Sequence, residues 1–379
     1  MHRFVYLDHN ATVPMKPAAT DAVRDAAGLI GNPSSVHRFG RAARRLLEDA
    51  REKVAILAGA DPAGVIFTSG ATEANTLAIR GLRRRRLLIA ATEHASVLGA
   101  AADAERIAVD RSGIIDLARL EDAIAAADGP ALVAVMMANN ETGVIQPLAE
   151  VTRLARRFGA LVHTDAVQAA GRLPIHMRDL GVASLALSAH KFGGPCGVGA
   201  LVVDPSLAVS PLFSGGGQER GLRAGTENLL GIAGFAAAAE AVGGALADQP
   251  RLAGLRDRLE SRLRSAVPAV TTLGSDVARL ANTSCITMPG VASETQVIAF
   301  DLAGIAVSAG AACSSGKVAA SHVLKAMGVG DEIARSAIRI SLGWTTTESD
   351  IESFLAAWQA IYSRAGRDRS RANVMGMSG

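Results

Sequence analysis

A lysine and an aspartate each end a segment that begins as an apolar run typical of a buried strand. Lys191 ends the segment SAHK, directly after the apolar run 184–187, and a loop of small residues follows it. Asp165 ends the segment 161–165. If the two strands lie side by side, their carboxyl ends bring the amine and the carboxylate to one edge of a sheet. Pyridoxal phosphate (PLP) needs this pair, because a lysine amine forms a Schiff base with it and a carboxylate keeps its pyridine nitrogen protonated.

A strand–turn–helix pattern offers a site for the phosphate of such a cofactor. The segment TSGATEAN (68–75) follows an apolar run, so the backbone N–H groups of Ala71 and Thr72 would begin a helix, where an anion is favoured. By itself this segment is more simply explained as a helix cap. Together with the lysine segment it favours phosphate binding, to which the side chains of Thr72, Ser188 and His190 could also donate.

Two further side chains could contact the ring of the cofactor. His94 follows another apolar run, and an imidazole there could stack on a flat ring and relay protons, although a single histidine is more often structural. Gln168, three residues after Asp165, could donate a hydrogen bond to the phenolic oxygen of the ring. Without these neighbours we would expect Gln168 on an exposed helix face.

These residues depend on a sheet whose strands end at a common edge. Short apolar runs typical of strands alternate with helical patterns over the first two thirds of the chain, at 65–68, 87–91, 131–138, 161–165, 184–187 and 198–204. Nearly continuous apolar strands indicate a sheet that is buried on both faces, with helices as crossovers. We therefore predict an α/β fold with a mostly parallel central sheet and a second, smaller α/β domain.

The pattern changes near residue 250, where an amphipathic helix is expected over 251–267. We place the second domain there and expect the N-terminal segment to join it. The predicted division is a large PLP-binding domain over 14–255, a small domain over 1–13 and 256–365 that carries the loop around Cys313, and a disordered tail over 366–379.

Composition limits the class of protein. Hydrophobic residues make up 49% of the 379 residues, and the formal net charge is only +3, so we expect no nucleic-acid partner. The apolar stretch 229–239 is too short to span a bilayer and is typical of a buried helix. The N-terminus lacks a signal-peptide pattern, and the cysteines are spaced for neither a metal site nor a disulfide framework. We therefore expect a cytoplasmic protein that binds no membrane.

Taken together, the motifs point to one family. The chain resembles the cysteine desulfurases of the NifS/IscS-like group, which are PLP-dependent enzymes of the class V aminotransferase family with the aspartate-aminotransferase fold (fold type I). The matching runs are YLDHNAT (6–12), NPSSVHRFG (32–40), TSGATEAN (68–75), TEHASV (92–97), NNETG (139–143), HTDAVQ (163–168), SAHK (188–191), GGGQERGLRAGTEN (215–228), SAGAACSSG (308–316) and RISLG (339–343). Each run is weak alone, but together they are specific.

The resemblance implies a role for each candidate residue. Lys191 would hold PLP covalently, Asp165 would pair with the pyridine nitrogen, Gln168 with the phenolic oxygen, and His94 would stack on the ring. The implied phosphate site consists of Ala71, Thr72, Ser188, His190 and, from the second subunit of a homodimer, Thr226. The implied substrate contacts are Asn10, Asn140 and Arg339. An arginine inside the apolar pattern 337–343 needs a buried anion, and a carboxylate suits it well.

The resemblance also makes Cys313 the catalytic thiol. Its neighbours are small, which is typical of an exposed loop, although a buried position is the simpler interpretation for an arbitrary cysteine. The thiolate would attack the sulfur of L-cysteine, L-alanine would leave, and a persulfide would remain on Cys313. A sulfur-acceptor protein, such as an Fe–S scaffold or part of a tRNA-thiolation route, would then receive the sulfur.

Other functions remain open from the sequence. A selenocysteine lyase or a PLP aminotransferase on the same scaffold would need no loop thiol for its first half-reaction. A non-catalytic relative could only bind sulfur-transfer partners, but the intact lysine, aspartate, histidine and cysteine argue against this. Cys196 stands where relatives usually carry a basic residue, which we interpret as a structural substitution, and Cys285 is expected in a core strand.

Overall fold

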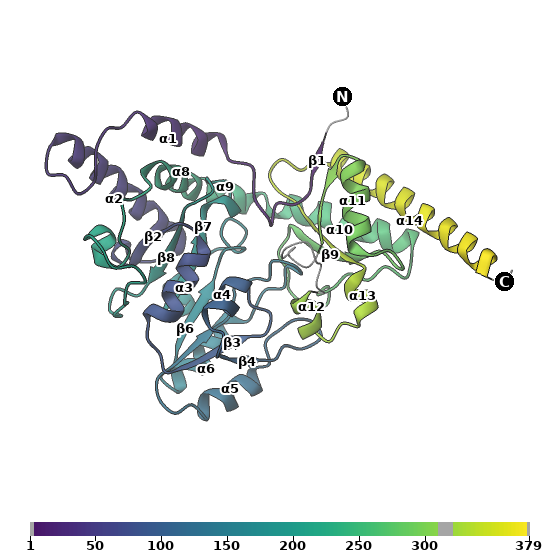
Figure 1. Cartoon of the computed structure of the whole chain (residues 1–379), viewed down its shortest axis with the longest axis horizontal. Helices are drawn as coiled ribbons and strands as arrows, with labels where there is room; N and C mark the ends of the chain where they lie inside the picture. Colours follow the sequence, from purple (N-terminus) through teal and green to yellow (C-terminus); the bar gives the residue numbers. More distant parts are fainter. Residues whose placement is uncertain (1–3, 310–320, 377–379) are drawn as a thin grey trace.

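The computed structural model describes residues 4–309 and 321–376, and a seven-stranded sheet forms the centre of its larger part (Figure 1). The strand order is β2-β8-β7-β6-β5-β3-β4. Five of these strands are parallel to one another, whereas β8 runs antiparallel to both β2 and β7. The strands are β2 (Val65–Thr68), β3 (Arg86–Ala90), β4 (Glu105–Ile107), β5 (Ala131–Ala134), β6 (Leu161–Asp165), β7 (Ser184–Ser188) and β8 (Gly199–Val203). The predicted α/β fold with a mostly parallel sheet is confirmed.

Helices cover both faces of this sheet, which explains why its strands are apolar throughout. In β2, Val65 and Phe67 belong to a core cluster that also contains residues of α2, α5, α6 and α8, whereas Ile66 belongs to a separate cluster with residues of α3 and α4 on the other face. The helices of this part are α1 (Pro17–Ala27), α2 (Arg38–Ala58), α3 (Ala71–Gly81), α4 (Ala95–Ala100), α5 (Leu117–Ala125), α6 (Leu148–Arg157), α7 (Met177–Leu180), α8 (Leu229–Glu240) and α9 (Val242–Ala247). Burial on both faces fixes the register of each strand.

A second core lies beside the first and contains a three-stranded antiparallel sheet of order β11-β12-β9. A short parallel pair, β1 with β10, ties the N-terminal segment to it. Its elements are β1 (Val5–Tyr6), α10 (Gln249–Ala266), β9 (Thr283–Thr287), α11 (Ser293–Leu302), β10 (Ile305–Ala306), β11 (Ser308–Ala309), α12 (His322–Ala326), α13 (Asp331–Arg335), β12 (Ala337–Ser341) and α14 (Glu348–Gly376). Phe300 and Phe354 stack at its centre, with ring centroids 4.9 Å apart.

The two cores support the predicted division, with two differences at its borders. Leu252 and Leu255 already belong to the second core, so that core begins one turn before residue 256. The prediction of a disordered tail is wrong over 366–376, where α14 continues to Gly376. This stretch contains three arginines, which are good helix formers, and it directly continues the helix that packs on the second core.

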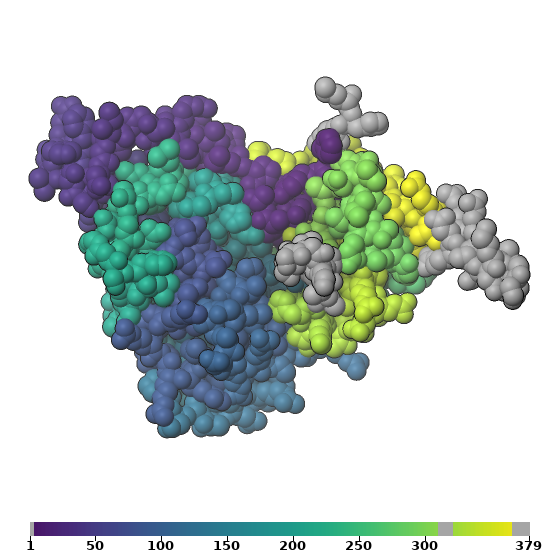
Figure 2. Space-filling model, viewed as in Figure 1, coloured from purple at the N-terminus to yellow at the C-terminus, as the bar shows by residue number. Residues whose placement is uncertain are grey.

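The N-terminal segment, purple in Figure 2, begins in the second core and continues into the first. Val5 and Leu7 are buried in the second core, and α1 packs on α8 in the first. No single helix among the described residues is both long and apolar enough to cross a membrane, although Leu229–Glu240 and Val242–Ala266, bent by 45°, pass that test as a pair.

Candidate active site

Asp165 and Lys191 lie at the same edge of the central sheet. Asp165 is the last residue of β6, and Lys191 ends the 3-10 turn Ala189–Lys191 that follows β7. Because β6 and β7 are parallel neighbours, with Asp165 opposite Ala186, their carboxyl ends carry both side chains to this edge. The structure therefore brings together the two residues from which the sequence argument began.

The amine of Lys191 is held among backbone carbonyls and positive charges. Nζ donates to the carbonyl of Asn10 at 2.8 Å and to that of Ala11 at 2.9 Å. Burial lowers the pKa of Lys191 to about 8, and the positive charges of Arg339 and Arg172 add to this effect. An amine that loses its proton near neutral pH can act as a nucleophile and as a base.

The Asp165 carboxylate is buried and is surrounded by neutral donors. It accepts hydrogen bonds from the Asn75 side chain at 2.7 Å and from the Val167 N–H at 3.0 Å. His163 in turn bonds to the Asn75 amide oxygen at 3.0 Å, which fixes the orientation of that amide. No lysine or arginine in the described ranges forms an ion pair with Asp165. A buried carboxylate without a cationic partner fits a protonated ring nitrogen.

His94 precedes α4 and caps its first turn. Its Nδ1 lies 2.8 Å from the Ser96 hydroxyl and accepts from the Ser96 N–H at 3.2 Å. The side chain is exposed on one side, yet the surrounding protein still lowers its pKa, mainly by desolvation and further through the charge of Lys191. A neutral imidazole beside this edge suits stacking on a flat ring.

Two of the predicted phosphate residues, Ala71 and Thr72, begin α3. A Cβ added at the preceding Gly70 would meet no atom within 4 Å, so the space beside the helix start is open. Ser188 is buried at the end of β7, opposite Gly199, which in turn pairs with Thr68 just before this helix. The ring of His190 lies 3.2 Å from the Thr12 hydroxyl. An open helix N-terminus fits a phosphate.

Gln168 is buried and already has partners in the protein. Its amide donates one hydrogen bond to the Asn10 carbonyl at 3.0 Å, while its oxygen accepts from Arg172 at 2.7 Å. The second N–H bond of the amide is the one that could serve the expected ring oxygen. Sequence reasoning missed Arg172, which is buried and holds the Gln168 oxygen.

The side chain of Asn10 is also engaged by the protein. Its amide donates to the Asn140 carbonyl at 3.1 Å and to the Thr283 hydroxyl at 2.9 Å, and its oxygen accepts from Asn282 at 3.0 Å. Both amide N–H bonds are therefore used, which differs from the expected contact with substrate. Through its carbonyl, Asn10 instead positions the amine of Lys191.

Arg339 lies in the middle of β12 and is buried, as an arginine in an apolar pattern requires. It donates to the Asp8 carboxylate at 2.7 Å and to the Asn140 carbonyl at 3.1 Å. Its Nε has no hydrogen-bond partner among the described residues. Asp8 therefore supplies at least part of the negative charge that a buried arginine needs. Asp8 was not among the predicted site residues, although it stands two positions before Asn10.

Glu93, next to His94, is a further buried carboxyl that the sequence argument missed. Its Oε1 accepts from the Met136 N–H at 2.5 Å, and its Oε2 has no partner among the described residues. Burial, with the nearby Asp165 charge, raises the pKa of Glu93 well above its ordinary value. Burial therefore favours the neutral form of the Glu93 carboxyl.

Thr226 lies exposed in the loop between β8 and α8. That loop is anchored by Glu219, whose carboxylate forms a buried ion pair with Arg51 at 2.8 Å. Both Glu219 and Arg220 adopt left-handed backbone angles, with φ of 45° and 59°. Non-glycine residues hold such a conformation only where the surroundings enforce it, and the ion pair does so here.

The cysteines fall into separate environments. Cys285 lies buried in β9, where desolvation raises its pKa to about 12, and this confirms it as a core-strand cysteine. Cys196 is exposed in the loop after the lysine. Cys313, the expected catalytic thiol, lies outside the described residues.

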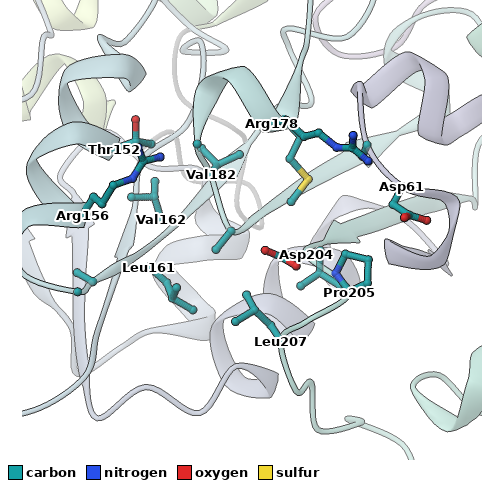
Figure 3. Close-up of a pocket in the computed structure, with 17 residues that line it drawn as sticks. Asp61, Thr152, Arg156, Leu161, Val162, Arg178, Val182, Asp204, Pro205 and Leu207 are labelled. Atoms are coloured by element: carbon teal, nitrogen blue, oxygen red, sulfur yellow. The ribbon is translucent and has the colours of Figure 1, made fainter.

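A cavity of about 600 Å³ lies at the other edge of the sheet (Figure 3). It is lined by Leu161 at the start of β6 and by Val182 and Ala183, which precede β7. Arg156 and Arg178 stand on opposite sides of it. Since Asp165 and Lys191 lie at the carboxyl ends of these strands, the cavity is not part of their site.

Comparisons with known proteins match this arrangement. Residues 5–354 match the family model described as aminotransferase class-V. The chain is 45% identical over 369 residues to a cysteine desulfurase of Cereibacter sphaeroides, covering 93% of this chain and 94% of that protein. It is 40% identical over 381 residues to an IscS-like cysteine desulfurase of Mycobacterium tuberculosis, covering 96% and 97%. The X-ray structure of a NifS-like protein from Rickettsia africae superimposes with a TM-score of 0.89 at 37% identity, covering 95% of this chain and all of that one.

Proposed function

The chain belongs to the aminotransferase class-V family, and we propose that it is a PLP-dependent cysteine desulfurase of the NifS/IscS-like group. It converts L-cysteine to L-alanine and leaves the sulfur as a persulfide on Cys313. The names of its relatives support this activity. One structural observation carries the proposal: Asp165 and Lys191 lie at the same edge of the sheet. Asp165 has no cationic partner among the described residues, and the pKa of Lys191 is lowered.

PLP would be held by residues at or after the ends of strands β3, β6 and β7 of the central sheet. Lys191 would bond to it covalently, Asp165 would pair with its ring nitrogen and His94 would stack on its ring. When bound, PLP supplies an electron-accepting ring that stabilises negative charge developing on the substrate. Ala71, Thr72, Ser188 and His190 would hold its phosphate, the first two through the start of α3. Gln168 would donate to its phenolic oxygen and contacts the Asn10 carbonyl that also holds the lysine.

The chain's own residues then carry the reaction. Arg339 and Asn140 hold the carboxylate of L-cysteine, for which the Arg339 Nε–H is available. The Lys191 amine, whose lowered pKa suits a base, would move protons between the substrate carbons. The Cys313 thiolate attacks the substrate sulfur, so that an S–S bond forms, the C–S bond breaks and its electron pair stays with carbon. A proton then completes L-alanine.

The working unit is a homodimer in which Thr226 of each chain completes the phosphate site of the other. Its exposure and the fixed loop that carries it support this arrangement. Exposed apolar side chains of Phe213 and Leu230 flank the same loop and are suited to burial against a second copy.

The persulfide sulfur passes to an acceptor protein, for which an Fe–S scaffold is the leading candidate. A selenocysteine lyase or aminotransferase activity is the alternative. We place the reaction in the cytoplasm, where the thiols of Cys196, Cys285 and Cys313 stay reduced.

Replacement of Cys313 tests the proposal. The variant Cys313→Ala should remain yellow and loaded with PLP but form no persulfide from L-cysteine, because the attacking thiol is gone. Cys196→Ala is the matched control, since it removes an exposed thiol that the mechanism does not use. Sulfide release at the wild-type rate by Cys313→Ala would exclude the thiol mechanism and favour the alternative activities.

A further inference from the structure

Arg339, which is proposed to bind the substrate carboxylate, already forms an ion pair with Asp8. Asp8 Oδ1 lies 2.7 Å from the Arg339 NH2 group, and the two side chains are only 18% and 9% exposed. The other Arg339 contact, to the Asn140 carbonyl, uses NH1. A guanidinium has five N–H bonds, and the Arg339 Nε–H has no partner among the described residues. The arginine can therefore donate to a second carboxylate while it stays paired with Asp8.

Asp8 is fixed where it stands. Its backbone carbonyl accepts from the Tyr6 hydroxyl at 3.1 Å and from the Ala11 N–H at 3.0 Å, and a β-bridge joins Asp8 to Ser341 beside β12. Its second carboxylate oxygen lies 3.4 Å from the hydroxyl of Ser308, the residue directly opposite Arg339 in the β11–β12 ladder. The carboxylate therefore stays beside the guanidinium when another anion arrives.

We propose that Asp8 sets the affinity of the substrate site for carboxylates: it orients Arg339 and offsets part of its positive charge. This inference rests on the proposed function, since it needs Arg339 to bind the substrate carboxylate. Two carboxylates on one guanidinium repel each other, so Asp8 weakens the binding of both L-cysteine and L-alanine. Weak binding of L-alanine allows the product to leave.

The variant Asp8→Asn separates charge from geometry. The asparagine side chain has the same shape and keeps an oxygen that can accept from Arg339, but it carries no charge. If Asp8 offsets the charge of Arg339, the variant binds carboxylates more tightly. If Asp8 serves only to orient Arg339, binding stays the same or weakens.

Titration calorimetry of the PLP-loaded protein with L-alanine measures this directly. We expect Asp8→Asn to lower the Kd for L-alanine and the KM for L-cysteine by about tenfold, which two charges a few ångströms apart in a partly buried site readily produce. The turnover number should not rise with the affinity, because product release slows. Asp301→Asn, which removes an exposed charge on α11, is the matched control and should change both constants less than twofold.

The outcomes distinguish the two proposals. An unchanged or raised Kd for L-alanine in Asp8→Asn, with wild-type desulfurase activity intact, overturns the role of Asp8 and leaves the proposed function standing. A wild-type protein that neither binds L-alanine nor releases sulfur from L-cysteine overturns the proposed function and the inference together.

Discussion

The backbone carbonyl of Asn10 accepts hydrogen bonds from both the Lys191 amine, at 2.8 Å, and the Gln168 amide, at 3.0 Å. One carbonyl from the start of the chain thus holds two groups that come from consecutive strand ends. Burial and the positive charges of Arg339 and Arg172 nevertheless lower the pKa of that amine.

The lowered pKa of Lys191 predicts how the apoprotein takes up PLP. Only the neutral amine reacts with the aldehyde, so the rate of reconstitution should rise with pH and level off above about 8. The growth of the absorbance band of the bound cofactor measures this rate. Lys191→Ala is the control, in which PLP can bind without a covalent link. A rate that still rises steeply toward pH 10.5, the ordinary lysine value, would contradict the prediction.

Glu93 makes the stability of the protein depend on pH. A carboxyl whose folded pKa is raised keeps its proton in the folded state while the unfolded chain ionises. Stability is therefore lost as pH rises above the ordinary value of 4.5 and until the folded pKa is reached. Glu93→Gln removes this loss and keeps the shape of the neutral acid. In urea unfolding, the free energy of unfolding of the variant should rise relative to that of the wild type by up to about 1.4 kcal/mol per pH unit as pH increases from the ordinary value toward the raised folded pKa.

The control for this measurement is Glu150→Gln, which changes an exposed carboxylate at the start of α6. Its stability relative to the wild type should hardly vary with pH. Parallel curves for Glu93→Gln and the wild type would mean that Glu93 is ionised in the folded protein.

The buried pair of Arg51 and Glu219 should be worth far more than the surface ion pairs. Their side chains are only 4% and 1% exposed, and Glu219 also accepts from the Phe67 N–H at 2.8 Å. Glu219→Gln leaves the partly exposed Glu48 to offset the buried arginine charge and should cost about 3 kcal/mol of unfolding free energy. Chemical denaturation checks this value.

The matched control is Glu240→Gln, because the Lys53–Glu240 pair is solvent-exposed and should contribute less than about 1 kcal/mol. If the loop of Glu219 presents Thr226 to a second subunit, Glu219→Gln also weakens PLP retention, which dialysis followed by absorbance measures. Similar losses of stability in both variants would show that burial does not strengthen the pair.

Gly199 allows β8 to pass close to the start of α3. A Cβ at this position would lie 2.6 Å from the Leu187 carbonyl oxygen and 2.7 Å from the Gly70 Cα, both backbone atoms that cannot rotate away. Gly199→Ala should push the first turn of α3 out of place and weaken PLP binding roughly tenfold, the effect of 1–3 kcal/mol of overpacking. Equilibrium dialysis measures the affinity.

Gly254→Ala is the control for this substitution. Gly254 lies exposed within α10, where an added Cβ would meet nothing within 4 Å, so alanine should stabilise the helix by about 0.5–1 kcal/mol and leave PLP binding unchanged. Wild-type affinity in Gly199→Ala would mean that α3 does not contact the phosphate.

Local patterns revealed the strands and helices because those segments are buried on one or both sides. The strands β2 and β6 and the helix α3 coincide with the runs 65–68, 161–165 and 71–81. The run 131–138 is a regular strand only to Ala134, although the N–H groups of Val135 and Met137 still donate to the β6 carbonyls of His163 and Asp165. The antiparallel direction of β8 left no trace in its composition, because a strand buried on both faces is apolar in either direction.

The polar contacts of the site were harder to foresee. Asp8 and Arg339 are 331 residues apart, and an acidic residue near the N-terminus shows no periodicity that would link it to a late strand. The same holds for Asn10, whose amide joins Asn140 and Thr283. Sequence motifs indicated candidate residues for the site. Long-range hydrogen bonds decide which of these residues still have a donor available for a cofactor or a substrate.

Residues 4–12, which deliver Asp8, Asn10 and Ala11 to the site, pair with β10 and β12, which lie hundreds of residues further along the chain. On the ribosome, this segment must therefore wait until residue 341 has emerged, even though the seven-stranded sheet can form earlier. A nascent chain can thus gain its main scaffold without gaining chemical competence. Reactive sulfur is produced only by molecules in which β12 has already been made.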